Sequence, residues 1–173
     1  MNEPDIRDLV DIFNRLFAVT ENTIIEIGVK EPFYQAAIED QKAIIFSRED
    51  FFSSALHEIA HWTIAGYERR RLDDFGYWYE PEGRTAEQQR EFELVEVKPQ
   101  AVEWLLSLAC NHRFHFSSDN ISQGIEASDA FQNSVKSQAL DYLQSSLPKR
   151  AQLLYKQLIN HFRQGEAVRV TDV

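Results

Sequence analysis

The sequence has little cysteine, little positive charge and no long apolar run, and each shortage excludes a class of protein. Cys110 is the only cysteine among 173 residues, so neither an intramolecular disulfide nor a thiolate metal cage can form. Its apolar neighbours predict a buried, inert thiol. Basic residues number 18 against 28 acidic ones, and the net charge of −10 argues against direct nucleic-acid binding, because attraction to phosphates needs clustered Lys and Arg.

The apolar segments are all too short to cross a bilayer, and the acidic first residues lack the apolar stretch of a signal peptide. We therefore expect a soluble cytoplasmic protein with no membrane partner. The run Arg69-Arg70-Arg71 is the local exception to the acidic character. Such a run is more often a solvated helix end than an anchor for an acidic partner. The sequence predicts no particular oligomeric state.

The first half of the chain should alternate between helix and strand. Ile6 to Phe17 repeats apolar residues at helical spacing after Pro4. Thr23–Val29 and Ala43–Phe46 are short and β-branched, which predicts two strands, and we expect a loop over Glu31–Gln41 between them.

A second helix should begin with Ser47 as its cap, with Asp50 reaching back, and should end near Gly66. Residues 75–79 read as a strand or extended loop. A long helical pattern covers 85–109, where Pro99 either kinks one helix or opens another. Further helices are expected over 128–145 and 148–165. The result is one α+β domain, 1–173, with a central helix on a small mixed sheet and a helical C-terminal part.

The clearest chemical signal is His57-Glu58-Ile59-Ala60-His61. Residues four apart lie above one another on a helix, so the two imidazoles can share one metal ion. Glu58 lies close enough to reach a metal-bound water and is the candidate catalytic residue. The flanking residues are apolar nearly all round, which predicts a buried helix where histidines need partners. Two satisfied core histidines are the alternative.

A third ligand is required, since two histidines alone do not make a tight site. Glu96 is the first choice, because it precedes a dense apolar stretch and should face the core. Glu93, one turn earlier, is the reserve, and a solvated helix face is the alternative for both. The remaining histidines are interpreted as structural or solvated. His112 and His115 lie three apart, but their alternating surroundings suggest a strand or loop that turns them to opposite faces, and His161 has no acidic or histidine partner at ligand spacing.

Three stretches together resemble a known family, the bacterial elongation factor P hydroxylases. They are His57–Trp62, Asp74–Arg84 and Val95–Ala101. The resemblance implies hydroxylation of the modified lysine of elongation factor P after a β-lysyl group has been attached to it. It implies an α+β fold similar to a small metal-dependent endoribonuclease family associated with ribosome maturation. It also implies an iron centre of two histidines and one carboxylate, which map to His57, His61 and Glu96.

This chemistry agrees with the residues. Such a triad leaves about three positions open on Fe(II), enough for dioxygen and a co-reductant or water, while zinc remains a possible substitute. Tyr77, Trp78 and Tyr79 could wall the site and grip the aliphatic stem of the substrate, although core packing is an equally good reading. A substrate that ends in amines favours carboxylates at the mouth, Asp74 first, with the others at Asp73, Glu80 and Glu82.

Other functions use the same motif. In a zinc metallohydrolase the same three residues would hold Zn²⁺ and Glu58 would deprotonate the attacking water. A metal-dependent nuclease is suggested only by the implied fold, and the acidic charge opposes it. A non-catalytic adaptor for elongation factor P is the third alternative. The co-reductant is unknown from the sequence, where only Lys98 is a candidate to bind a 2-oxoglutarate carboxylate.

Overall fold

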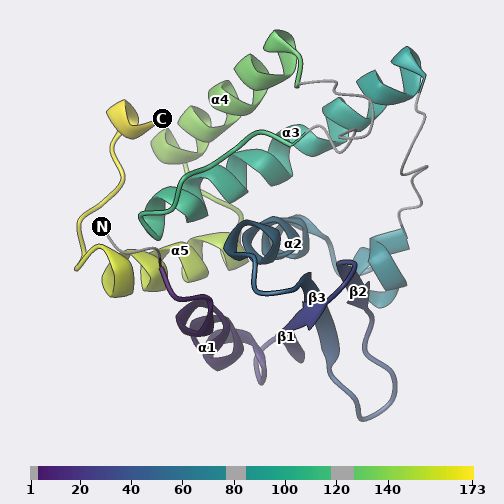
Figure 1. Cartoon of the computed structure of the whole chain (residues 1–173). Helices are drawn as coiled ribbons and strands as arrows, with labels where there is room; N and C mark the ends of the chain where they lie inside the picture. Colours follow the sequence, from purple (N-terminus) through teal and green to yellow (C-terminus); the bar gives the residue numbers. More distant parts are fainter. Residues whose placement is uncertain (1–3, 77–84, 118–126) are drawn as a thin grey trace.

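The computed structural model describes residues 4–76, 85–117 and 127–173. These residues form an α+β domain with five α-helices and one three-stranded sheet (Figure 1). The elements are α1 (Ile6–Phe17), β1 (Thr23–Val29), β2 (Phe33–Gln35), β3 (Ala43–Arg48), α2 (Phe52–Ile64), η1 (Arg69–Arg71), η2 (Asp73–Gly76), α3 (Ala86–Ala109), α4 (Asp129–Gln144), α5 (Lys149–Phe162) and η4 (Val170–Asp172).

The sheet is mixed, with β3 at its centre. β1 pairs with β3 in parallel, Ile25 opposite Ile45, and β2 pairs with the other edge of β3 in antiparallel orientation. The parallel register shifts between Ile27 and Val29. Gly28 occupies this shift with a φ of 104°, a conformation that glycine adopts without the steric cost of a Cβ.

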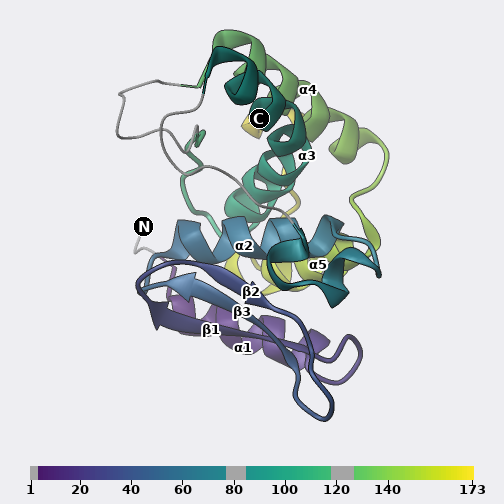
Figure 2. The ribbon, with the colours of Figure 1, turned by 90° about the vertical axis from the view of Figure 1, so that its right-hand side faces the viewer.

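Helix α2 lies at the middle of the molecule. It packs against β3, α3 and α5, and Figure 2 shows it between the sheet below and α3 and α4 above. Trp62 of this helix is fully buried against Phe13 and Phe17 of α1, with ring centroids 5.0 and 4.9 Å away. These contacts fix the position and rotation of α2, and with it the direction in which the rest of its side chains point.

The C-terminal end of α2 is held by Arg150 from α5. Its guanidinium donates to the carbonyl oxygens of Trp62 and Thr63 at 3.0 and 3.2 Å, and to that of Ala65. It also lies over the Trp62 ring, 4.8 Å from the centroid. The last carbonyls of a helix lack partners within it and form the negative end of its dipole, so a cation there stabilises the helix.

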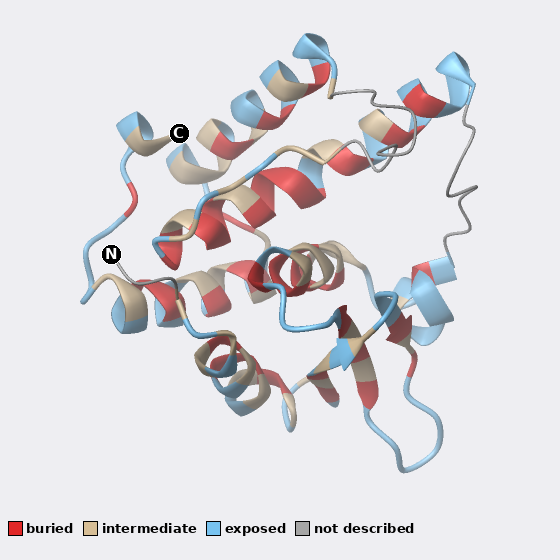
Figure 3. Cartoon of the chain, in the orientation of Figure 1, coloured by how far each residue is buried: buried red, intermediate tan, exposed pale blue. Residues whose placement is uncertain are grey.

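Helix α3 carries the second layer. Thr85 caps it, because its side chain accepts from Gln88 N while the Gln88 side chain accepts from Thr85 N. The helix continues through Pro99 as a single element, so of the two alternatives for this residue the structure has one helix and not a second one opening there. The middle of α3 is buried against α2 (Figure 3). The buried face includes polar side chains, which is unusual and points to a site.

Most predicted elements are confirmed, and three local expectations are wrong. Residues 31–41, expected to form a loop, contain the strand β2. A strand of only three residues is too short to show an alternating apolar pattern in the sequence. Ser47 is not a helix cap: it lies buried in β3, and α2 starts after Phe51. Residues 75 and 76 belong to the 3₁₀ turn η2 rather than a strand or extended loop, because Asp74 and Phe75 adopt φ values of 46° and 58°; the rest of that prediction, 77–79, lies outside the described residues.

Across the described ranges, no helix has the length and apolar character needed to span a membrane.

Candidate metal centre

The two histidines of α2 sit side by side on the face that points toward α3. Their ring centroids are 4.7 Å apart, as expected for positions one helical turn apart. The side chains of His57 and His61 are 21% and 17% exposed, whereas their neighbours Leu56, Ile59 and Ala60 are fully buried. The histidines therefore lie at the border between the core and solvent.

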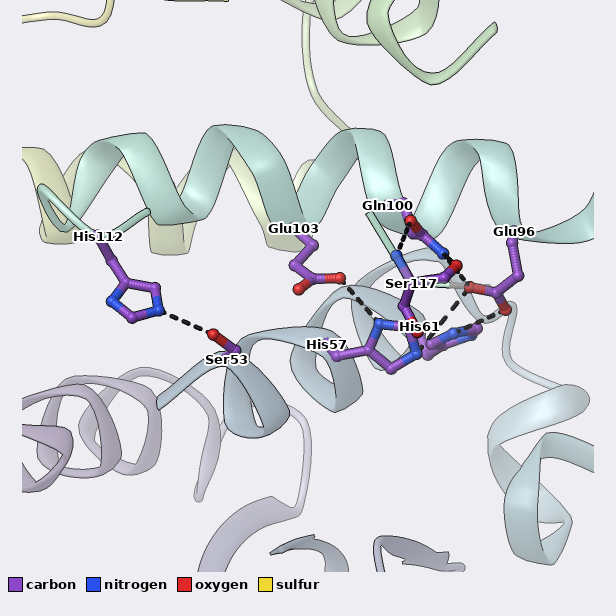
Figure 4. A network of polar contacts seen from close by, with 8 residues as sticks. All are labelled: Ser53, His57, His61, Glu96, Gln100, Glu103, His112 and Ser117. Atoms are coloured by element: carbon purple, nitrogen blue, oxygen red, sulfur yellow. Dashed lines mark hydrogen bonds and ion pairs between the residues drawn. The ribbon is translucent and has the colours of Figure 1, made fainter. Parts of the chain in front are cut away.

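Helix α3 brings a carboxylate to the same place. Glu96 Oε1 lies 3.1 Å from His61 Nε2, and Glu96 Oε2 lies 3.9 Å from His57 Nε2 (Figure 4). The Glu96 side chain is only 3% exposed. A buried carboxylate is costly unless it is paired, and here the partners are the imidazoles. Within the described part of the chain, His57, His61 and Glu96 are the one group whose potential metal-ligating atoms all lie within 4.8 Å of each other.

Electrostatics keep Glu96 ionised. Burial alone would raise its pKa, but attraction to His61 and His57 and hydrogen bonds from His61 and Gln100 outweigh burial and lower the pKa to about 2. A ligand of a metal ion must be deprotonated. Glu96 meets this requirement throughout the physiological pH range.

His57 has a second acidic neighbour. Its Nδ1 lies 2.8 Å from Oε2 of Glu103, which is 5% exposed and comes from the same face of α3 as Glu96. Burial lowers the pKa of His57, but Glu103, Glu96 and Glu58 together raise it well above the usual value. In the metal-free protein these carboxylates therefore favour the protonated His57 ring over the neutral one.

Gln100 links this centre to the chain that follows α3. Its side-chain amide donates to Ser117 O at 2.7 Å and, at 3.4 Å, to Glu96 Oε2, while its oxygen accepts from Ser117 N at 3.1 Å. Gln100 is fully buried. Its three hydrogen bonds satisfy the amide and hold Ser117 beside the carboxylate, as Figure 4 shows.

The donor set fits a divalent transition metal. Imidazole nitrogens suit Fe, Zn, Ni and Cu, and two histidines with one carboxylate on neighbouring helices are the donors of open iron centres. The gap of 3.9 Å between His57 Nε2 and Glu96 Oε2 exceeds a hydrogen bond, so these two atoms face each other without being bonded. A cation placed among the three residues would neutralise the carboxylate and engage both rings.

The other candidate site residues on helices lie near this centre or on its margin. Glu58 is half-buried on α2, and its charge contributes to the raised pKa of His57. Glu93, the reserve ligand, instead accepts a hydrogen bond from Ser128 Oγ at the start of α4, at 3.0 Å. Lys98 is exposed on α3.

The candidate substrate-binding residues lie partly outside the described ranges. Tyr77, Trp78 and Tyr79 fall there, as do Glu80 and Glu82. Asp74 and Asp73 are described. They accept hydrogen bonds from the backbone nitrogens of Tyr34 and Ala36, at 2.8 and 2.9 Å. These carboxylates therefore cover the open edge of β2, and burial raises the pKa of Asp74.

The three histidines outside the motif each occupy a separate environment. His112 Nε2 lies 2.8 Å from Ser53 Oγ at the first turn of α2, and His115 is exposed. His161 Nε2 lies 3.1 Å from Asp8 of α1, an acidic partner that the sequence spacing does not reveal. These placements agree with structural or solvated roles.

The basic run forms the turn η1, and its side chains are engaged. Arg70 pairs with Glu21 at 2.9 Å, and Arg71 lies 3.5 Å from Glu68. Arg69 donates to the carbonyl oxygen of Phe75 at 3.1 Å. Arg69 and Arg70 therefore tie the segment after α2 to its surroundings, in a short 3₁₀ helix of its own, while the side chain of Arg71 is 64% exposed.

Sequence reasoning missed Glu103 and Gln100. A signal was present: both interrupt the apolar stretch that follows Pro99, and with Glu96 they recur at intervals of four and three residues. That spacing places all three on one helix face. A polar stripe on the buried face of a helix predicts a network that shares one partner.

Comparison with known proteins identifies the family. A family model described as elongation factor P hydroxylase matches residues 12–172. The elongation factor P lysine hydroxylase of Haemophilus influenzae is 48% identical over 159 residues, which cover 91% of this chain and 89% of that protein. The match extends through the motif helix, the stretch around Glu96 and the C-terminal helices. The chain belongs to the elongation factor P hydroxylase family.

Proposed function

We propose that this protein hydroxylates the β-lysyl-modified lysine of elongation factor P, with Fe(II) held by His57, His61 and Glu96 and with dioxygen as the oxidant. The observation that carries the proposal is the convergence of two imidazoles and a buried carboxylate within 4.8 Å, in a chain that belongs to a hydroxylase family. The whole chain, 1–173, then acts as one hydroxylase domain in the cytoplasm, with a fold related to the small metal-dependent endoribonucleases.

The three residues divide the work of holding the metal. Glu96 supplies the negative charge, and its low pKa keeps that charge in place. His57 and His61 supply neutral nitrogens from a helix that is fixed by Trp62 and Arg150. When bound there, Fe(II) supplies the means to activate dioxygen, since a triad of this kind leaves positions open for other ligands. Hydroxylation places one oxygen atom in a carbon–hydrogen bond and releases the other as water, with two electrons from a reductant.

The partly exposed side of the two histidine rings is the place where the modified lysine would enter. Both rings are partly exposed, whereas Glu96 lies behind them. The substrate is a long aliphatic chain that ends in positively charged amines. We propose that Tyr77, Trp78 and Tyr79 hold the aliphatic part, and that Asp74 attracts an amine. The net charge of −10 favours the approach of a cationic group.

A zinc hydrolase would use the same ligands, with Glu58 as the base. The family match favours the hydroxylase, because its description and the name of the relative both specify hydroxylation of elongation factor P. We further propose that Glu58 acts on protons or water near the metal and has no essential role as a hydrolytic base.

Metal reconstitution tests this proposal. Protein stripped with a chelator and handled without oxygen is loaded with Fe(II) or with Zn(II), and each sample is incubated in air with a reductant and β-lysylated elongation factor P. We expect hydroxylated product, detected by intact-mass analysis, with Fe(II) and none with Zn(II). Activity with Zn(II) alone, or equal activity of the stripped protein, would overturn the assignment of iron.

A further inference from the structure

We propose that Glu103 is a positioning residue for the metal centre: it holds the His57 ring so that Nε2 presents its lone pair to the metal. This inference rests on the metal site of the proposed function. It starts from one contact, the 2.8 Å approach of Glu103 Oε2 to His57 Nδ1, seen near the centre of Figure 4.

The chemistry of the two groups fixes which nitrogen carries the proton. A neutral imidazole has one N–H donor and one acceptor nitrogen, whereas an ionised carboxylate can only accept. Nδ1 of His57 must therefore be the donor to Glu103. His57 must be neutral to bind a metal, and with Nδ1 as the donor, Nε2 is then the acceptor nitrogen. It is this nitrogen that faces Glu96 Oε2 across 3.9 Å. Without Glu103, Nδ1 would lose the acceptor that favours the tautomer with its proton on Nδ1. The other tautomer carries the proton on Nε2 and cannot bind a metal through that nitrogen.

The helix geometry makes the arrangement rigid. Glu96 and Glu103 are seven residues apart on α3 and therefore lie on the same face, two turns from each other. One helix thus supplies both the ligand and the residue that orients a second ligand. The Glu103 side chain is 7% exposed, and burial of a carboxylate costs free energy unless it is hydrogen-bonded. A short charge-assisted hydrogen bond to His57 offsets that cost.

A carboxylate behind a metal-bound histidine typically raises metal affinity by 10–100-fold. We therefore expect Glu103→Ala to weaken Fe(II) binding by roughly that factor, measured by anaerobic titration calorimetry. Glu103→Gln should lie between the wild type and Glu103→Ala. The amide oxygen can still accept from Nδ1–H, but the amide NH₂ can also donate to an unprotonated Nδ1 and stabilise the wrong tautomer. Glu91→Gln, at an exposed position of the same helix, serves as the matched control and should bind Fe(II) as the wild type does.

A spectroscopic measurement separates positioning from a merely structural role. In the Zn(II)-loaded wild type, nitrogen NMR of labelled histidine should show His57 protonated at Nδ1 and metal-bound through Nε2. Glu103→Ala should show a second ring state or loss of the Nδ1–H signal, while thermal unfolding of the metal-free form checks that the variant is folded. If Glu103→Ala does not fold, the same comparison is made with Glu103→Gln.

The inference is overturned if the folded variants bind Fe(II) as tightly as the wild type, or if their His57 resonances are unchanged. Failure of the proposed function looks different, because the wild-type protein itself would then bind no Fe(II) or form no hydroxylated product. The two outcomes are therefore distinguishable in the same set of samples.

Discussion

His61 Nε2 lies 3.1 Å from Glu96 Oε1, and this contact joins two helices that meet only in the folded protein. Neither residue could make the contact if α2 or α3 were rotated about its axis by one position. Trp62, packed against α1, and the buried face of α3 set those rotations. The geometry of the centre is therefore a consequence of how the core packs.

The first prediction concerns Glu96 as the carboxylate that binds the metal. Glu96→Gln keeps the size of the side chain and removes its charge, so we expect Fe(II) affinity to fall by more than about 100-fold, the upper end for a residue that only orients a ligand, with loss of hydroxylation. Glu93→Gln is the matched control, because its amide oxygen can still accept from Ser128. Anaerobic Fe(II) titration of both variants is the measurement. Equal losses in both, or a larger loss in Glu93→Gln, would refute the assignment.

Glu58 distinguishes hydroxylase from hydrolase chemistry. A hydrolase needs a base to deprotonate the attacking water, whereas hydroxylation by dioxygen does not. We expect Glu58→Gln to retain more activity than His57→Ala, measured as the rate of product formation under Fe(II) saturation. His57→Ala should lose activity because a metal ligand is gone. Should Glu58→Gln prove as damaging as His57→Ala while both remain folded, the hydrolase alternative would be supported.

Asp74 combines a structural contact with a proposed role toward the substrate, and two substitutions separate them. Its Oδ1 accepts from Tyr34 N, and Asn can make the same hydrogen bond without the charge. Asp74→Asn should therefore keep its stability, while Asp74→Ala should lose roughly 1–3 kcal/mol because the Tyr34 N–H loses its partner. If the charge attracts a substrate amine, Asp74→Asn should raise the KM for modified elongation factor P.

The measurements for Asp74 are urea unfolding and steady-state kinetics on the same preparations. An unchanged KM in Asp74→Asn would remove Asp74 from the substrate site and leave it as a cover for the edge of β2. An unfolding free energy of Asp74→Ala equal to that of the wild type would contradict the structural role.

The longer helices and the two longer strands could be predicted because their signals are local: apolar residues at helical spacing in the former, short β-branched runs in the latter. The motif on α2 could be found because two histidines four apart converge on any regular helix. The identity of the third ligand needed more, since Glu93 and Glu96 are both acidic and one turn apart. The rotation of α3 about its axis determines which of the two glutamates faces the histidines. That rotation is set by the packing of the core and not by the local sequence.

Other features lay beyond sequence reasoning for physical reasons. The strand β2 owes its formation to pairing with β3 and to the burial of Tyr34, which stacks on Phe75 at 4.3 Å. Both are long-range contacts with no local signal. The same holds for the approach of Asp8 to His161. Pro99 left two alternatives open, because a proline disfavours a helix interior locally, and only the structure shows that α3 continues through it.

Cys110 tests the packing of the core near the end of α3. It is 1% exposed, and burial raises the pKa of its thiol. Only the thiolate reacts with alkylating reagents, so we expect native protein at pH 8 to react very slowly and urea-unfolded protein to react at once. Rapid modification of the folded protein would show that the core opens locally at this point.

The raised pKa of Cys110 also determines how the free energy of unfolding changes with pH. Above the ordinary thiol pKa of about 8.5 the unfolded chain loses this proton while the folded protein keeps it. Cys110 therefore makes the protein less stable as pH rises past that value, by up to about 1.4 kcal/mol per pH unit. Cys110→Ala lacks this ionisation, so its unfolding free energy should fall less between pH 8 and pH 10. An identical pH dependence in both proteins would contradict the prediction.

The central claim is that His57, His61 and Glu96 hold the metal at which dioxygen hydroxylates the modified lysine. A single-turnover reaction tests this assignment: Fe(II)-loaded protein, β-lysylated elongation factor P and a reductant are combined under dioxygen of the heavy oxygen isotope, and the modified peptide is analysed by mass spectrometry. We expect one heavy oxygen atom on the modified lysine with the wild type and none with His61→Ala. Product that carries oxygen from water, or equal product from folded His61→Ala, would contradict it.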